Sequence, residues 1–142
     1  MEPGRQEVFE TALRETLSRL SRSGKRVIFL HSVPELPFKA RECVAWNPNR
    51  FVNRAPRPDC AVDEKVTEKR LAEYRPFLDR ILADYPQITQ IDPVPLICSG
   101  FDCRGRRDGI LLYRDDDHLS LDGAKWVARQ IAPLLPHSIA KE

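Results

Sequence analysis

The residues of this chain best suited to chemistry lie in the segment LYRDDDHLSLDGA, residues 112–124. Asp115 and His118 are three positions apart, so on a turn entering a helix the carboxylate can reach the imidazole. A carboxylate bound to one ring nitrogen fixes the tautomer and leaves the other nitrogen free as a general base. The alternative is that Asp115, Asp116 and Asp117 only complement the positive end of a helix. Spacing alone favours that alternative, because motifs this short recur by chance.

Patterns typical of alternating helices and strands surround this segment. The apolar run Val27–Leu30 is typical of a strand covered on both faces in a parallel sheet, and Ile88–Asp92 is a second strand candidate. A helix is expected after Asp63, with Pro76 kinking it or splitting it in two. Ser120 is a suitable N-cap for a final helix. These patterns predict an α/β fold with a parallel sheet between helices.

The predicted sheet is short of strands. Besides the two good strands, only the brief apolar segment Gly109–Tyr113 is visible, whereas sheets usually hold about four to six strands. We therefore expect an incomplete sheet, as in the later part of a doubly wound domain.

Composition excludes several classes of protein. The chain has 142 residues, 42% hydrophobic and 31% charged, which is typical of one globular domain. The net charge of +2, with both signs interspersed, predicts no nucleic-acid partner. Apolar runs fall far short of the roughly 18 residues of a membrane span. The charged N-terminal segment has no apolar signal core, so we expect no export signal in this chain itself.

Four cysteines, Cys43, Cys60, Cys98 and Cys103, all lie in loop-like stretches, and their even number favours disulfides. Cys98 with Cys103 would close a small loop and Cys43 with Cys60 a long one, each with a Cα separation of about 4.4–6.8 Å. A zinc site is the first alternative, although only one pair is close in sequence. Free structural thiols are the second alternative. Two disulfides would imply an oxidising compartment, such as the bacterial periplasm.

The block LYRDDDHLSLDGAKWVARQI resembles the final block of the SGNH hydrolase/acyltransferase superfamily. In particular, it looks like the SGNH domain fused to acyltransferase-3 membrane proteins that O-acetylate bacterial cell-surface polysaccharides. The segments VIFLHSVPELPF and LICSGFDC, and the cysteine at Cys43, are similar to the same group. The resemblance is strongest over residues 26–131, and we interpret residues 1–142 as a partial SGNH domain.

This resemblance implies a three-layer, flavodoxin-like fold, here incomplete, and the activity of an O-acyltransferase or ester hydrolase without cofactor or metal. Asp115 and His118 would be the acid and base of a Ser-His-Asp triad, with Asp116 and Asp117 as surface or capping residues. The implied partners are a polysaccharide or other glycan acceptor and an acyl donor. The implied location is the periplasmic side of the inner membrane, as part of a larger protein.

The chain departs from the family in its nucleophile. Neither the Gly-Asp-Ser block nor the Gly-x-Asn-Asp block of the family occurs in the sequence. Ser32 follows the first strand, but Pro34 and the lack of a following helix spoil a nucleophile elbow there. We therefore expect the chain alone to be inactive and to need an N-terminal SGNH segment and the acyltransferase-3 membrane domain. The alternatives are a non-catalytic remnant and a metal-binding or interaction domain built on the four cysteines.

Overall fold

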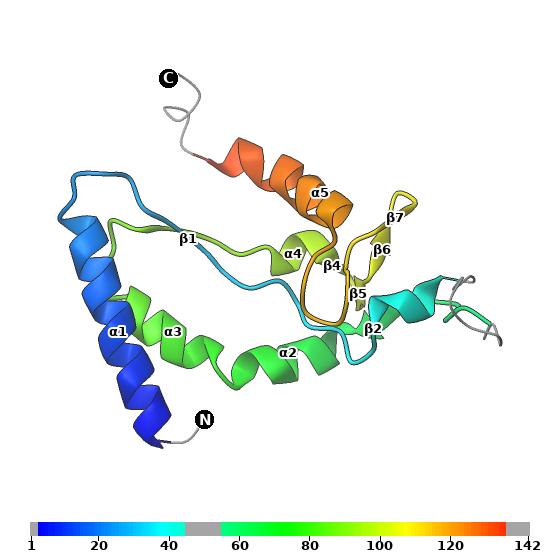
Figure 1. Cartoon of the computed structure of the whole chain (residues 1–142), viewed down its shortest axis with the longest axis horizontal. Coiled ribbons are helices and arrows are strands. Elements are labelled where there is room, and N and C mark those ends of the chain that lie inside the picture. The colour runs from blue at the N-terminus through cyan, green and yellow to red at the C-terminus, as the bar shows by residue number, and fades with distance from the viewer. Residues whose placement is uncertain (1–2, 45–54, 136–142) are drawn as a thin grey trace. The chain divides into compact units, whose positions relative to one another are not determined.

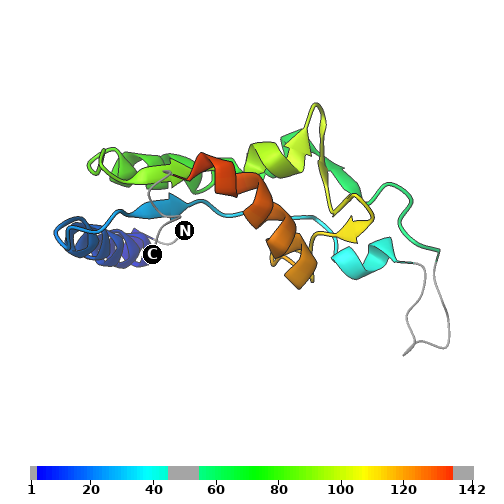
Figure 2. The same cartoon turned by 90° about the horizontal axis from the view of Figure 1, so that it is seen from above.

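The computed structural model describes residues 3–44 and 55–135. The chain divides into two compact units, and each is built from two separate stretches of sequence. The first unit joins the residues up to Leu30 to Ala72–Ile91, and the second joins His31–Leu71 to the residues from Asp92 onward. Figures 1 and 2 show the helices and strands of both units.

The first unit holds the parallel strands that the sequence predicts. Strand β1 pairs in parallel with β3, with Ile28 opposite Thr89 and Leu30 opposite Ile91. The described residues of this unit form α1 (Pro3–Ser21), β1 (Ile28–Leu30), α3 (Arg75–Leu82) and β3 (Thr89–Ile91). Among the described residues, the sheet of this unit consists of these two strands. The expectation of a short, incomplete parallel sheet within an α/β fold is thus confirmed.

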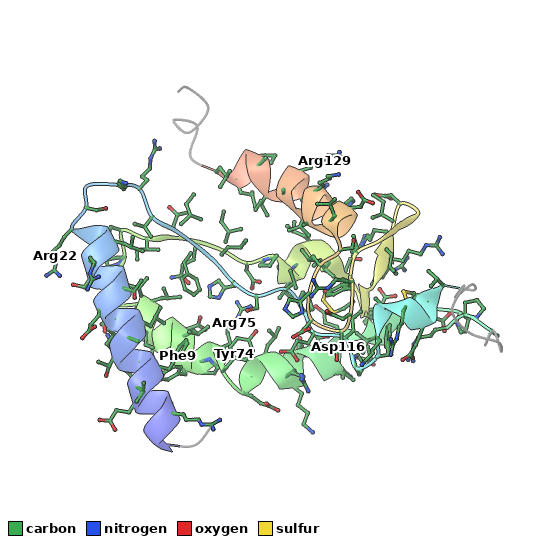
Figure 3. The ribbon with its side chains drawn as sticks, in the orientation of Figure 1. Phe9, Arg22, Tyr74, Arg75, Asp116 and Arg129 are labelled. Carbon is green, nitrogen blue, oxygen red and sulfur yellow. A yellow bond between two sulfur atoms is a disulfide. The ribbon has the colours of Figure 1, made fainter. Side chains whose placement is uncertain are left out.

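Helices α1 and α3 form the core of the first unit. Leu17 of α1 is buried in one cluster with Phe77, Ile81 and Leu82 of α3. The ring of Phe9, labelled in Figure 3, lies with its centroid 6.0 Å from that of Phe77. Pro76 stands in the first turn of α3, where a missing backbone N–H costs little, so the expected helix is split there.

Part of the apolar surface of this unit stays exposed. Val8 on α1 is 71% exposed, and Leu30 at the end of β1 is 51% exposed. The prediction that Val27–Leu30 is covered on both faces is therefore wrong for this chain. Two strands and two helices supply too little apolar surface to bury a strand on both sides.

The second unit is built from short antiparallel strands and helices. One sheet has the order β2-β5-β4, and a separate hairpin pairs β6 with β7. Its elements are η1 (Ala40–Cys43), β2 (Ala61–Asp63), α2 (Glu64–Ala72, its last residue in the first unit), α4 (Val94–Ile97), β4 (Cys98–Ser99), β5 (Asp102–Arg104), β6 (Arg106–Arg107), β7 (Ile110–Leu111), α5 (Leu121–Ile131) and η2 (Ala132–Leu134).

The segment Gly109–Tyr113, expected as a further piece of the incomplete sheet, is antiparallel instead. Its residues Ile110 and Leu111 form β7 of this hairpin, and Tyr113 forms an isolated antiparallel bridge with Leu119. Asp108 and Gly109 join β6 to β7 with φ angles of 49° and 77°. Positive φ at both central residues defines the tight turn that suits a hairpin, and the pair Asp-Gly favours it.

A cluster of buried side chains holds the second unit together. Leu112, Tyr113 and Ile97 are fully buried in this cluster. The Tyr113 hydroxyl donates a hydrogen bond of 2.7 Å to the carbonyl of Pro34, so this buried polar group is satisfied. Burial raises the pKa of the Tyr113 phenol well above its usual range, which keeps it a neutral donor.

Both predicted disulfides are present. Cys43 is bonded to Cys60 with a Cα separation of 5.3 Å, and Cys98 to Cys103 with one of 3.9 Å. The second separation is shorter than predicted, because Cys98 and Cys103 are direct cross-strand partners next to a tight hairpin turn. All four thiols are consumed in these bonds, so they offer no thiolate ligands for zinc.

Helix α5 begins in unusually close contact with the chain leaving β7. Ser120 caps the helix by accepting a 2.9 Å hydrogen bond from the N–H of Gly123. The Ser120 hydroxyl also donates 2.6 Å to the Leu111 carbonyl, and its N–H donates 2.8 Å to the Leu112 carbonyl. A Cβ at position 123 would overlap the Leu112 carbonyl oxygen and lie 2.7 Å from the Leu112 Cα. Only glycine fits there.

Replacing Gly123 by alanine should therefore destabilise the protein. We expect Gly123→Ala to lower the free energy of unfolding by about 1–3 kcal/mol in urea denaturation, since backbone must move to admit the methyl group. The matched control is Gly4→Ala in α1, where a Cβ meets nothing within 4 Å, and it should unfold at the wild-type urea concentration or above. A Gly123→Ala protein as stable as wild type would contradict the close approach.

Candidate catalytic site

The loop Arg114–His118 is held at both of its ends. Tyr113 and Leu119 form an antiparallel bridge across its base, and the N–H of Arg114 donates 2.8 Å to the carbonyl of His118. The loop carbonyls of Asp115 and Asp116 also accept hydrogen bonds, from Ala40 at 2.9 Å and Leu36 at 2.7 Å respectively. Backbone hydrogen bonds thus anchor the loop to the rest of the second unit.

The carboxylate of Asp115 organises the inside of this loop. Its Oδ1 accepts hydrogen bonds from the backbone N–H groups of His118, at 2.8 Å, and Asp117, at 3.2 Å. Its Oδ2 lies 3.1 Å from the guanidinium of Arg114. The N–H of His118 is the main cause that holds the pKa of this carboxyl well below its usual range, with smaller contributions from Asp117 and Arg114.

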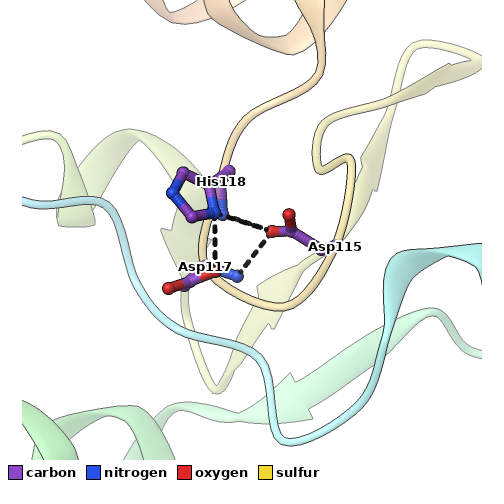
Figure 4. Close-up of side chains that lie close together, drawn as sticks. All are labelled: Asp115, Asp117 and His118. Atoms are coloured by element: carbon purple, nitrogen blue, oxygen red, sulfur yellow. Dashed lines mark hydrogen bonds and ion pairs between the residues drawn. The ribbon is translucent and has the colours of Figure 1, made fainter.

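The imidazole of His118 lies against Asp115, as the spacing of the two residues predicts. Its Nδ1 is 3.1 Å from Asp115 Oδ1. A carboxylate accepts only, so Nδ1 carries the proton and the second ring nitrogen has a free lone pair in the neutral form. Figure 4 shows this second nitrogen on the side of the ring away from the carboxylates. With 63% of its side chain exposed, His118 is accessible to a reacting group.

The other two aspartates behave differently from each other. Asp116 is exposed, as expected of a surface residue, and is labelled in Figure 3. Asp117 is 52% exposed, but its Oδ1 lies only 2.8 Å from His118 Nδ1. The expectation that Asp117 is a surface or capping residue is therefore incomplete, because helical spacing gave no reason to pair neighbours in sequence. The carboxylates of Asp115 and Asp117 thus both lie beside the same ring nitrogen of His118, Nδ1.

Asp115, Asp117 and His118 offer ligand atoms within 4.8 Å of one another, a grouping that could hold a metal ion. Nδ1 of the histidine already faces both carboxylates, and all three side chains keep substantial exposure. The same three side chains can also act without a metal, with the Asp115 carboxylate as the acid in contact with the His118 imidazole as the base.

The described residues bring no hydrogen-bonded nucleophile to His118. Among residues 3–44 and 55–135, no serine hydroxyl is hydrogen-bonded to its imidazole. The Ser120 hydroxyl is engaged with Leu111 and Gly123, and Ser99 accepts a hydrogen bond from Arg107. Ser32 is exposed in a loop. The site therefore provides an acid and a base, and their catalytic roles stay predictions.

A family model described as "SGNH domain (fused to AT3 domains)" matches residues 1–133. The match covers nearly all of the chain, which therefore belongs to the SGNH domains of this fused type. No curated protein matches the chain in sequence.

A solved structure, that of the Salmonella ser. Paratyphi A lipopolysaccharide acetyltransferase periplasmic domain, is similar in fold, with a TM-score of 0.54 and 16% sequence identity. The alignment covers 91% of this chain and 49% of that one, so the chain spans about half the length of its structural neighbour. Within the part of the chain that the structure describes, no helix is long and apolar enough to cross a membrane.

The low pKa of Asp115 leads to a pH prediction. Its carboxyl should stay ionised as the pH falls below about 3.9, the usual value for aspartate, when followed by carbon-detected NMR. Because the pKa of Asp115 is lower in the folded than in the unfolded chain, the ionised carboxylate stabilises the folded loop at any pH above the unfolded-state pKa. This stabilisation is lost as the pH falls through the folded-state pKa. Arg114→Gln should raise the titration midpoint of Asp115 only part of the way toward the usual aspartate value, because the backbone N–H donors remain. A wild-type midpoint at 3.9 or higher would contradict the geometry.

Proposed function

We propose that this chain is the acid–base part of an SGNH O-acyltransferase domain acting on cell-surface polysaccharide, with the nucleophilic serine supplied by sequence outside these 142 residues. The observation that carries the proposal is the 3.1 Å contact between Asp115 Oδ1 and His118 Nδ1 on an exposed loop. Family membership over residues 1–133 supports it, because the family is fused to AT3 domains.

In this proposal the second ring nitrogen of His118 takes the proton of the serine hydroxyl as the serine oxygen attacks the acyl carbonyl of a donor. The imidazolium, stabilised by Asp115, returns the proton to the leaving group, and an acyl-serine ester remains. A sugar hydroxyl then loses its proton to His118 as its oxygen attacks the ester carbonyl, and the imidazolium returns that proton to the departing serine oxygen, which leaves the sugar acylated and the serine and histidine in their starting forms. Water in place of the sugar would give ester hydrolysis.

We place this chemistry on the periplasmic side of the inner membrane, in a longer protein that also carries the acyltransferase-3 membrane domain. Two disulfides within a single small chain fit an oxidising compartment. The structural neighbour is itself a periplasmic domain of a lipopolysaccharide acetyltransferase. The acceptor proposed here is likewise a polysaccharide of the cell surface.

A non-catalytic remnant is the second candidate, favoured by the lack of a serine hydroxyl on His118 among the described residues. Activity measurements separate the two candidates. The alternative of a cysteine-based metal site loses its ligands, because both disulfides are formed.

The first activity test compares two proteins with an activated acetyl ester such as 4-nitrophenyl acetate. This chain alone should give no burst above buffer, since it lacks the Gly-Asp-Ser block. A longer chain with that block in front of this sequence should give an acyl-enzyme burst, and His118→Ala should abolish it. A burst from the isolated chain that His118→Ala removes would overturn the assignment of the nucleophile. No burst from the longer chain would favour the remnant.

The three aspartates can be ranked in the same longer chain. Asp115→Asn keeps an acceptor for the loop N–H groups but removes the charge beside the imidazole, so kcat should fall by about 100-fold or more. Asp117→Asn should cost less than about tenfold, since that exposed carboxylate is screened by water. Asp116→Asn, which touches no part of the imidazole, is the matched control and should keep wild-type kcat. Equal losses for Asp115→Asn and Asp116→Asn would remove Asp115 from the mechanism.

A further inference from the structure

A positively charged cavity of about 380 Å³ lies beside the Cys43–Cys60 disulfide in the second unit. Its lining combines the two cysteines and Arg57 with the strands and turn of residues 104–109. Cavities of this size hold small ligands or single sugar units. None of its lining residues belongs to the loop that carries His118.

Positively charged residues outnumber negatively charged ones in the lining of this cavity. Four arginines are among its lining residues, against two aspartates, Asp59 and Asp108. The Asp108 carboxylate already accepts a 3.1 Å hydrogen bond from Trp126 Nε1. Arg104 pairs at 3.3 Å with Asp102, which is not part of the lining. Arg106 is exposed and has no ion pair among the described residues. Four arginines and two aspartates give the lining residues a net charge of +2.

Two of the arginines are held in place before any ligand arrives. The guanidinium of Arg57 stacks 4.0 Å above the ring centroid of Phe38, and the backbone N–H of Arg57 donates 2.7 Å to the carbonyl of Glu42. Arg107 donates from Nη2 to the Ile97 carbonyl at 3.2 Å and to Ser99 Oγ at 2.7 Å. The Nε of Arg107 is buried with no hydrogen-bond partner. Fixed guanidinium groups lose little side-chain entropy on binding.

We propose that this cavity binds an oxyanion, a carboxylate or phosphate, borne by a sugar of an acidic polysaccharide. The planar guanidinium matches such groups with two parallel N–H donors, and charge-assisted hydrogen bonds of this kind are strong. The cavity would hold an acidic sugar of the acceptor chain away from His118. The choice of a glycan as carrier rests on the proposed function, whereas the preference for an oxyanion does not.

The test is calorimetric titration of the full chain at low salt with trigalacturonic acid, which bears carboxylates, and with neutral maltotriose. We expect trigalacturonic acid to bind and maltotriose not to bind. Arg106→Gln should weaken the binding of trigalacturonic acid about fivefold to tenfold, and it should fold normally because Arg106 is exposed. The matched control is Arg129→Gln on the exposed surface of α5, labelled in Figure 3, which should bind like wild type.

Equal binding of the acidic and neutral sugars, or equal losses in the two variants, would overturn the proposal. Binding to phosphatidylglycerol vesicles without binding to trigalacturonic acid would also overturn it, in favour of a lipid partner. His118→Ala should leave the affinity unchanged, so the two proposals fail separately. If trigalacturonic acid binds but the serine-bearing longer chain gives no burst, only the proposed function is contradicted. If the longer chain gives a burst but trigalacturonic acid does not bind, only the proposal of oxyanion binding in this cavity is contradicted.

Discussion

The close approach of α5 to the Leu112 backbone is the constraint on which the loop Arg114–His118 depends. With no room for a side chain at Gly123, the first turn of the helix sits directly against the strand end that precedes the loop. Ser120 bonds to both sides of this junction. Since the two ends of the loop are fixed, only a few conformations can join them. The place of His118, two residues before the cap, is therefore set by the junction rather than by packing of its own exposed ring.

The loop divides labour between backbone and side chains. The carbonyls of Asp115 and Asp116 accept from Ala40 and Leu36 respectively, which leaves the carboxylates free for other contacts. Asp115 uses Oδ1 both to close the turn and to face the imidazole. An acid that is kept ionised by backbone donors is well suited to stabilise an imidazolium, because its charge is present over the whole range in which histidine titrates.

The sequence predicted those features that local chemistry determines. Residue type and spacing were enough to predict the two parallel strands, the helix break at Pro76 and the cap at Ser120. They were also enough to predict both disulfides and the contact between Asp115 and His118. The short antiparallel strands of the second unit were missed, because strands of two or three residues show no period. The contact of Asp117 with His118 was missed as well, since it depends on how the loop turns. The partial exposure of Leu30 could not be foreseen from an apolar run, because burial depends on how many other elements surround it.

The interleaving of the two units has a consequence for how the chain folds. The polypeptide passes from one unit to the other after Leu30, Leu71 and Ile91, so neither unit is a continuous stretch. The parallel pair of β1 and β3 must close over the whole segment between them before either strand gains its hydrogen bonds. Contacts so distant in sequence slow folding. Cutting the chain at a single point therefore cannot separate the two units from each other, and the first unit cannot be completed during synthesis until Ile91 has left the ribosome.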